Sequence, residues 1–431
     1  YINGMDLLGG RYNIATTNIP ASFVNSVQVL SNHQAIKADK DVFSDNVAIN
    51  VNMSNKAKLK PVGSYGVSFG TGKHALYEVN GAGMLFKSNF QMLASLKAGN
   101  ISQFALNEGT NHFDSKETVS TVSSLLGNIS ASTPPIEVDR YASPTDRLLS
   151  FNILRKIRKD VTLKGNVGYS YAKSQYDYSL TRSYTDAENN IVISQAYSPL
   201  SSVHRPSIQL EYKDNSDKTY LVNTLSGVGS FLTSELPTRE NGTLFNQKQT
   251  MREFFLNNKF STLWHHKDLR WSLTSVVSYQ GSPMGKVALD KETKDAVVQN
   301  ANGQSFRTEN TLSLSKKHRN SRIYLPILLN YYMDKVQTTL HPMDENNDVS
   351  MQNLRVALAP QYEYSHFQYR YVLRLEVPVR MDYIAHRDHM IASSSGSWYF
   401  SVCPSMYCNY KVTSRSVLRT NIFYARTFGD I

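Results

Sequence analysis

Hydrophobic and polar residues alternate with a period of two along most of the chain. In the longest example, from Phe367 to Tyr383, the odd positions are apolar or aromatic and the even positions are mostly charged or polar. Successive side chains of a strand point to opposite faces, whereas a helix with 3.6 residues per turn would scatter this pattern around its surface. The alternation therefore predicts strands, with further examples over residues 161–171 and 271–279.

The length of the alternating segments separates two kinds of β protein. Strands of soluble proteins are usually about 5 or 6 residues long. A strand that crosses an outer membrane at a tilt needs about 9–11 residues, with aromatic side chains at both interfaces. The segment from Phe367 to Tyr383 exceeds the first length and has Tyr369 and Tyr371 at one end and Tyr383 at the other. We therefore expect one strand here, with its apolar face toward lipid.

The predicted connections alternate between short and long. The short ones are at residues 158–160, 214–217, 265–268, 317–321, 365–366 and 412–415. The long ones are at residues 99–146, 175–205, 231–250, 282–307, 335–351 and 385–396. Tight turns on one rim and long loops on the other are typical of an outer-membrane barrel. The fold predicted is all-β, a transmembrane antiparallel β-barrel with about fifteen strands after residue 62.

Residues 1–58 have a different pattern. Two short alternating segments, 26–30 and 47–53, are separated by a polar stretch and by connections rich in Gly and Asn. This arrangement predicts a small separate domain over residues 1–58, followed by barrel over residues 59–431.

The opening segment resembles the end of the plug domain of TonB-dependent outer-membrane receptors, especially the large Bacteroidetes type. The resemblance lies in the order and spacing of short stretches at residues 1–4, 8–12, 19–20, 24–30 and 48–53. Its residues include Asn3, Gly4, Arg11, Tyr12, Val27, Val29, Ile49 and Val51.

The resemblance implies a protein of a Gram-negative outer membrane, in which a barrel of about 22 strands encloses a plug. It also implies the TonB–ExbB–ExbD system as partner, outer-membrane lipid around the barrel, a small imported solute and, as in some relatives, a surface lipoprotein. Because the chain starts within the plug pattern and carries about fifteen predicted strands, we expect an internal fragment of such a receptor.

Composition and charge narrow the alternatives. No stretch approaches the roughly 20 apolar residues that a membrane helix needs. Aromatic residues make up 11% of the chain and include 26 Tyr, as an interfacial girdle requires. The net charge is +11, but Lys and Arg are scattered rather than clustered. Nucleic acid is therefore not an expected partner.

The candidate site residues are the charged even positions of the long predicted strand: Arg370, Arg374, Glu376, Arg380 and Asp382. We expect them to face the barrel interior, either to bind the plug or an anionic solute, or as a charge-paired wall in contact with water. Residues 99–146, rich in Ser and Thr, are the first candidate for ligand capture at the surface.

No spacing of residues predicts a catalytic site, a metal site or a cofactor, so the chain is not expected to be an enzyme. The leading hypothesis is TonB-dependent nutrient import through a plug-gated barrel. The alternative is an ungated outer-membrane barrel that acts as a porin or a surface adhesin. The pattern does not distinguish glycan, peptide, siderophore or haem as the solute.

Overall fold

A computed structural model describes residues 1–40, 44, 46–55, 60–72, 74–109, 121–126, 129, 131–185, 190–266, 269–291, 296–366, 370–413 and 416–426. Within these ranges no helix is both long and apolar enough to cross a lipid bilayer.

The described part of the chain is almost entirely β structure, with a few short helices. The helices are α1 (Tyr12–Asn18), η1 (Ala21–Phe23), η2 (Lys37–Asp39), α3 (Ala105–Gly109), α4 (Thr121–Leu126) and η4 (Val138–Arg140). The strands before the first long connection are β1 (Val24–Leu30), β2 (Ala48–Met53), β3 (Val62–Thr71), β4 (Ala75–Phe86) and β5 (Phe90–Gly99). The next are β6 (Ser143–Arg158), β7 (Val161–Gln175), β8 (Tyr178–Thr185), β9 (Asn190–Tyr197), β10 (Leu200–Asn215), β11 (Thr219–Glu240), β12 (Thr243–His266) and β13 (Leu269–Lys291). The last are β14 (Val297–His318), β15 (Ser321–His341), β16 (Glu345–Leu358), β17 (Gln361–His366), β18 (Tyr371–Glu376), β19 (Val379–Asp388), β20 (Ser393–Val402), β21 (Ser405–Lys411) and β22 (Val417–Phe423).

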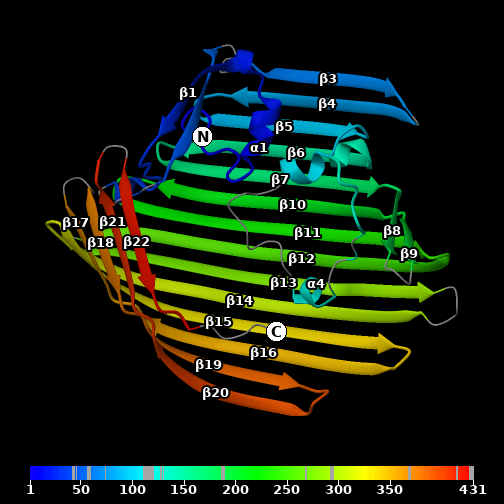
Figure 1. Ribbon diagram of the computed structural model, residues 1–431. Coiled ribbons are helices and arrows are strands. Elements are labelled where there is room, and N and C mark those ends of the chain that lie inside the picture. The colour runs from blue at the N-terminus through cyan, green and yellow to red at the C-terminus, as the bar shows by residue number, and fades with distance from the viewer. Residues whose placement is uncertain are drawn as a thin grey trace.

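Strands β3 to β22 form one large antiparallel sheet in which most strands pair with the next along the chain (Figure 1). The exceptions are at the β8–β9 hairpin and between β16 and β21. The hairpin β8–β9 is an insertion, because β7 pairs directly with β10. The segments β16–β17, β18–β19 and β20–β21 are each one strand interrupted at a proline, which leaves about fifteen full strands, as the sequence predicts. The predicted all-β antiparallel fold is therefore confirmed.

The three interruptions lie side by side. Proline has no backbone N–H, so the ladder cannot continue through it. The N–H of Ala359 donates to Pro326 O, that of Val377 to Pro360 O, that of Cys403 to Pro378 O, and that of Tyr424 to Pro404 O. The sheet changes direction along this row, and β17, β18, β21 and β22 rise at an angle to β16, β19 and β20 (Figure 1).

This row corrects the prediction of a single strand from Phe367 to Tyr383. The strand is broken at Val377 and Pro378 into β18 and β19, and it continues to Asp388. Residues 367–369 lie outside the described residues.

Several predicted long loops are wrong. Much of 231–250, 282–307, 335–351 and 385–396 belongs to paired strands, with β11 and β12 reaching 22 and 24 residues. Their hairpin turn is Asn241-Gly242, with φ of 47° and 89° at the two residues. Asn-Gly with positive φ at both positions makes the tight turn that suits the twist of two strands. The long connections are therefore 100–142 and the insertion that contains β8 and β9.

The two faces of the large sheet differ in polarity. Aliphatic side chains on one face, here called the outer face, keep about half of their area exposed; examples are Val167, Ile208, Leu256, Ile327 and Met381. The opposite face, here called the inner face, buries polar groups such as Asn152, Lys164 and Asn166. An apolar surface over so many strands would be costly in water but is favourable against lipid.

Candidate functional site

The described residues of 1–55, here called the N-terminal unit, pack against the inner face of β4–β7. Strands β1 and β2 form their own two-stranded sheet, and α1 lies over the large sheet (Figure 1). Leu7, Leu8 and Ile14 of the unit share one buried apolar cluster with Phe86 and Leu93 of the large sheet. Burial of a leucine or isoleucine side chain contributes about 1.5–3 kcal/mol, so this cluster is the main apolar attachment of the unit.

Hydrogen bonds to backbone carbonyls fix the unit beside this cluster. Gln91 Nε2, fully buried, donates to Ile2 O at 2.8 Å, and Asn166 Nδ2 donates to Leu7 O at 3.1 Å. Asn166 also donates to Asn152 Oδ1 at 2.7 Å. Buried amides need such partners, so inner-face polar residues that would be costly alone become specific contacts for the unit.

Lys164 is the charged centre of the contact. Its side chain is 2% exposed, and its Nζ lies 3.0 Å from Glu211 Oε2 and 3.4 Å from Asp6 Oδ2. Burial acts to raise the pKa of the Asp6 carboxyl, but the Lys164 ammonium and the Gly9 N–H outweigh it, so this pKa lies below its ordinary value. The charged carboxylate of Asp6 is therefore the favoured form in the contact.

A second set of polar contacts lies nearer the rim of short turns. Arg270 of β13 donates to both carboxylate oxygens of Asp39, from Nε at 2.7 Å and Nη2 at 2.5 Å. Lys37 Nζ donates to Asp160 Oδ1 at 2.6 Å, and Asn215 Nδ2 donates to Ala35 O. The planar guanidinium paired with a buried carboxylate makes Arg270–Asp39 the more specific of the two ion pairs.

The residues of the plug resemblance divide between contact and exposure. Asn3 and Gly4 form a turn with positive φ, and Asn3 Oδ1 accepts the N–H of Met53. Arg11 is buried, and Val51 packs on the apolar cluster. The other residues of the set are exposed: Tyr12, Val27, Val29 and Ile49. The predicted boundary at residue 58 lies outside the described residues.

Helix α3 joins the N-terminal unit to the large sheet, here called the wall. Glu108 Oε1 accepts from Lys97 Nζ at 2.6 Å, while its Oε2 accepts from Thr17 Oγ1 at 3.2 Å. Asn13 Nδ2 donates to Asn107 O. The connection between β5 and β6, expected to capture ligand at the surface, therefore folds onto the inner face in its described part.

The start of α3 is held by Asp146 of β6. Asp146 Oδ2 accepts the backbone N–H groups of Phe104 and Ala105, each at 2.7 Å. Its Oδ1 is buried and has no hydrogen-bond partner among the residues described. A buried carboxylate oxygen without a partner favours the binding of a further hydrogen-bond donor.

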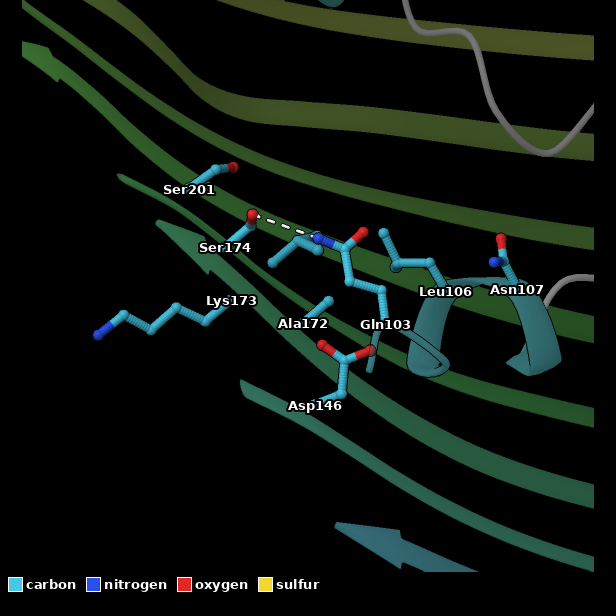
Figure 2. A pocket seen from close by; sticks show the side chains of 9 residues that line it. Gln103, Leu106, Asn107, Asp146, Ala172, Lys173, Ser174 and Ser201 are labelled. Carbon is cyan, nitrogen blue, oxygen red and sulfur yellow. Dashed lines mark hydrogen bonds between the residues drawn. The ribbon is translucent and has the colours of Figure 1, made fainter. Parts of the chain in front are cut away.

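A cavity of about 150 Å³ lies between α3 and the inner face of β6, β7 and β10. Gln103 closes one side by donating to Ser174 Oγ at 3.3 Å, and the Asp146 carboxylate points toward the space beneath it (Figure 2). Lys173 points away from this space, so Asp146 is the charged group that faces it (Figure 2). The cavity suits a small hydrogen-bond donor. Its residues come from separate strands and a loop, so no local sequence pattern identifies it.

The charged residues predicted on the long strand lie in two groups. Asp382, fully buried, pairs with Arg355 Nε at 2.6 Å and Arg380 Nε at 2.8 Å. Arg374 pairs with Glu363 Oε2 at 2.8 Å and lies over the Tyr407 ring.

Two members of the predicted set stand apart from these groups. Arg370 donates to Lys411 O near the turn, and Glu376 is half-buried opposite Ser405. Arg355 and Glu363 were missed because they become neighbours only through strand pairing.

No group of three or more potential metal ligands is present in the described ranges. His265 and His266, at the end of β12, are both exposed. The arrangement described above binds and positions groups, and it presents no nucleophile with a neighbouring base.

The large sheet consists of long antiparallel strands, with a lipid-compatible outer face, a polar inner face and a chain segment packed against that inner face. These features define the class of a membrane β-barrel wall. No family model and no curated protein matches the sequence.

Among solved structures, the chain is similar to the ferric-catecholate import receptor Fiu from E. coli, with 7% identity over 91% of this chain and 74% of that one and a TM-score of 0.34. It is also similar to the siderophore receptor PiuA from Acinetobacter baumannii (8% identity, 92% and 76% covered, TM-score 0.33). A third is FpvA of P. aeruginosa bound to pyoverdine (7%, 93% and 72%, TM-score 0.29). Because these TM-scores are low, the similarities are not used as an argument for fold or function. Both are inferred from this chain's own residues.

Proposed function

We propose that this chain acts as a TonB-dependent outer-membrane receptor that imports a small solute through a plug-gated barrel. In this proposal residues 1–58 are the C-terminal part of the plug and residues 59–431 belong to the barrel. The supporting observation is the attachment of the N-terminal unit to the polar inner face, centred on Leu7, Leu8 and the Asp6–Lys164–Glu211 ion pairs. A porin or adhesin has no need for a segment held there.

The character of this attachment suits a segment that is displaced during transport. The apolar cluster is small, and the surrounding contacts are hydrogen bonds and ion pairs to residues of the wall. Polar contacts of this kind exchange for water when the segment moves, so their loss costs less than the exposure of a large apolar interface. The resemblance to TonB-dependent receptors supports TonB–ExbB–ExbD as the source of energy.

The inner face gives the solute a polar path. The pairs Arg355–Asp382–Arg380 and Arg374–Glu363 supply a charged lining, and the cavity beside Asp146 supplies an unused acceptor. The solute is moved without covalent change. Glycan, peptide, siderophore and haem all remain candidate solutes, and a surface lipoprotein is a candidate partner.

Import is tested by competitive growth. Cells that make the chain compete with cells that lack it on defined single sources of carbon, peptide or iron, in strains with and without TonB. We expect enrichment on one source that disappears without TonB. Equal enrichment in both strains would exclude gated import and favour an ungated porin.

Gating is tested by ion conductance. Asp6→Cys and Lys164→Cys are bridged with a short bismaleimide in the full chain, which is then placed in a planar bilayer with KCl. We expect low conductance of the unmodified chain, higher conductance in Lys164→Ala and in the unbridged double-Cys variant, which also lacks the Lys164 ammonium, and low conductance again once the bridge is formed. High conductance of the unmodified chain would contradict the plug proposal. A bridge between Arg155→Cys and Leu163→Cys, which pair within the wall, is the matched control.

A further inference from the structure

A row of basic and aromatic side chains crosses five strands on the outer face. The pairing is direct at each step: Arg147 with Tyr171, Tyr171 with His204, His204 with Phe231, and Phe231 with Arg252. Paired residues of neighbouring strands point to the same face, so these five side chains form one continuous row. The row lies toward the rim with the two long connections.

The rows on either side have opposite characters. Two positions farther from that rim the residues are Leu149, Tyr169, Pro206, Gly229 and Phe254, and four positions farther they are Phe151, Val167, Ile208, Gly227 and Leu256. Apart from the Tyr169 hydroxyl, both rows are apolar. On the rim side, the next outer-face row contains Lys173, Ser202, Thr233, Thr250 and Lys286. The basic and aromatic row therefore lies where the apolar band of the wall gives way to polar surface, which is the level of lipid headgroups.

Several cations of this region have no carboxylate partner within the part of the chain that the structure describes. Among the described residues, no carboxylate pairs with Arg147, Lys173 or Arg252, although Lys248 nearby is paired with Glu235. The Arg147 guanidinium instead lies over the Tyr171 ring at 5.7 Å. Unpaired cations at a headgroup level attract anionic lipid.

A hollow of about 510 Å³ opens in this row. It lies beside Pro206, where the pairing of β10 with β11 skips from His204 to Ser207. Tyr169, whose hydroxyl bonds His204 Nδ1 at 2.7 Å, and Phe231 supply aromatic walls. Ser202, Thr233, Thr250 and Arg252 supply hydroxyls and a cation. Hydroxyls, aromatic faces and a guanidinium together suit a phosphorylated sugar.

We propose that this hollow and its basic row bind the phosphorylated headgroup of a glycolipid in the outer leaflet. The guanidinium groups of Arg147 and Arg252 contact phosphate, and the hydroxyl and aromatic residues contact the sugar. The inference depends on the proposed outer-membrane location, and it is independent of which solute is imported or whether import is gated.

The test compares lipid retained by the full chain in nanodiscs, measured by native mass spectrometry. The probes are diphosphoryl lipid A, its dephosphorylated form and phosphatidylglycerol. The variant is Arg147→Gln with Arg252→Gln. The control is Arg155→Gln with Lys316→Gln, which removes the same charge from the outer face near the opposite rim. Retained secondary structure, measured by circular dichroism, verifies folding, and the two single variants replace the double variant if it does not fold.

We expect retention of diphosphoryl lipid A to fall about fivefold for each arginine removed and to be unchanged in the control. The dephosphorylated lipid and phosphatidylglycerol should be retained weakly by all forms. Equal loss in variant and control would overturn the site, and equal retention of phosphatidylglycerol would overturn its assignment to a glycolipid. Because solute uptake is not measured, failure of the proposed import would leave this result unaffected.

Discussion

Lys164 has the most consequential single charge in the contact between the N-terminal unit and the wall. Replacement by Met leaves the carboxylates of Asp6 and Glu211 facing each other without the cation that lies 3.4 and 3.0 Å from them. Removal of one partner from a buried ion pair typically costs about 3–5 kcal/mol. We expect Lys164→Met to lower the free energy of unfolding by about 3 kcal/mol, because Asp6 is partly exposed.

The measurement is urea unfolding in detergent, followed by tryptophan fluorescence. Lys316→Met, an exposed lysine of β14 without an ion-pair partner in the described chain, is the control and should change stability by no more than about 0.5 kcal/mol. Equal effects of the two substitutions would mean that the Lys164 ion pairs do not stabilise the contact.

Two glycines of the wall should respond in opposite directions to the same substitution. A Cβ at Gly281 would lie 2.4 Å from Phe254 Cζ, because the ring of Phe254 covers this glycine from the paired position. A Cβ at Gly81 would meet nothing within 4 Å. We expect Gly281→Ala to destabilise by about 1–2 kcal/mol as the ring is displaced, and Gly81→Ala to stabilise by up to about 1 kcal/mol. The same urea titration measures both, and stabilisation by Gly281→Ala would show that the ring contributes no packing there.

At the level of elements, period two predicted the strands because each side chain of a strand has a fixed face. It did not predict where strands are interrupted. Pro378 is visible in the predicted strand, but its effect depends on Pro360 and Pro404 in neighbouring strands, whose carbonyls and N–H groups complete the row. The extended hairpins were missed because polar residues are frequent in the parts farthest from the short-turn rim, although Leu236 and Val336 there are buried. Asn241-Gly242 was the available signal for a tight turn between β11 and β12.

Helix α3 should depend on the carboxylate of Asp146. The substitution Asp146→Ala removes the acceptor of the Phe104 and Ala105 N–H groups, each of which donates at 2.7 Å. Hydrogen bonds to charged groups contribute about 1.5–3 kcal/mol, so we expect amide exchange in residues 104–108 to accelerate by roughly tenfold to a hundredfold.

Hydrogen–deuterium exchange with mass spectrometry measures this change. Ser201→Ala is the control, because Ser201 lines the same cavity but bonds only Ser234 Oγ, at 3.0 Å, among the described residues. Unchanged protection of α3 in Asp146→Ala would indicate that Glu108, through Lys97 and Thr17, is sufficient to hold the helix.

At the scale of the whole molecule, the sequence predicted the two faces of the wall better than its site. The alternation placed Leu375 and Met381 on one face and Arg374 and Asp382 on the other. The partners Arg355 and Glu363, and the contact of Asp6 with Lys164, connect residues that lie far apart along the chain. Such pairs depend on register and on the position of the N-terminal unit, and neither follows from a local pattern in one sequence.

The three tryptophans of the chain test which face meets lipid. Trp264 and Trp271 pair across β12 and β13 beside the short-turn rim, with ring centroids 6.3 Å apart and planes within 5°, and Trp398 of β20 is 57% exposed. All three occupy outer-face positions, at a place where indole is favoured because it has both an apolar ring and an N–H donor. We expect brominated phosphatidylcholine to quench the fluorescence of the folded chain. For Trp264 and Trp271, isolated by Trp398→Phe, bromine near the headgroup should quench more than bromine near the chain end. Stronger quenching by aqueous iodide than by either lipid would place these rings in water and would contradict a membrane-facing outer surface.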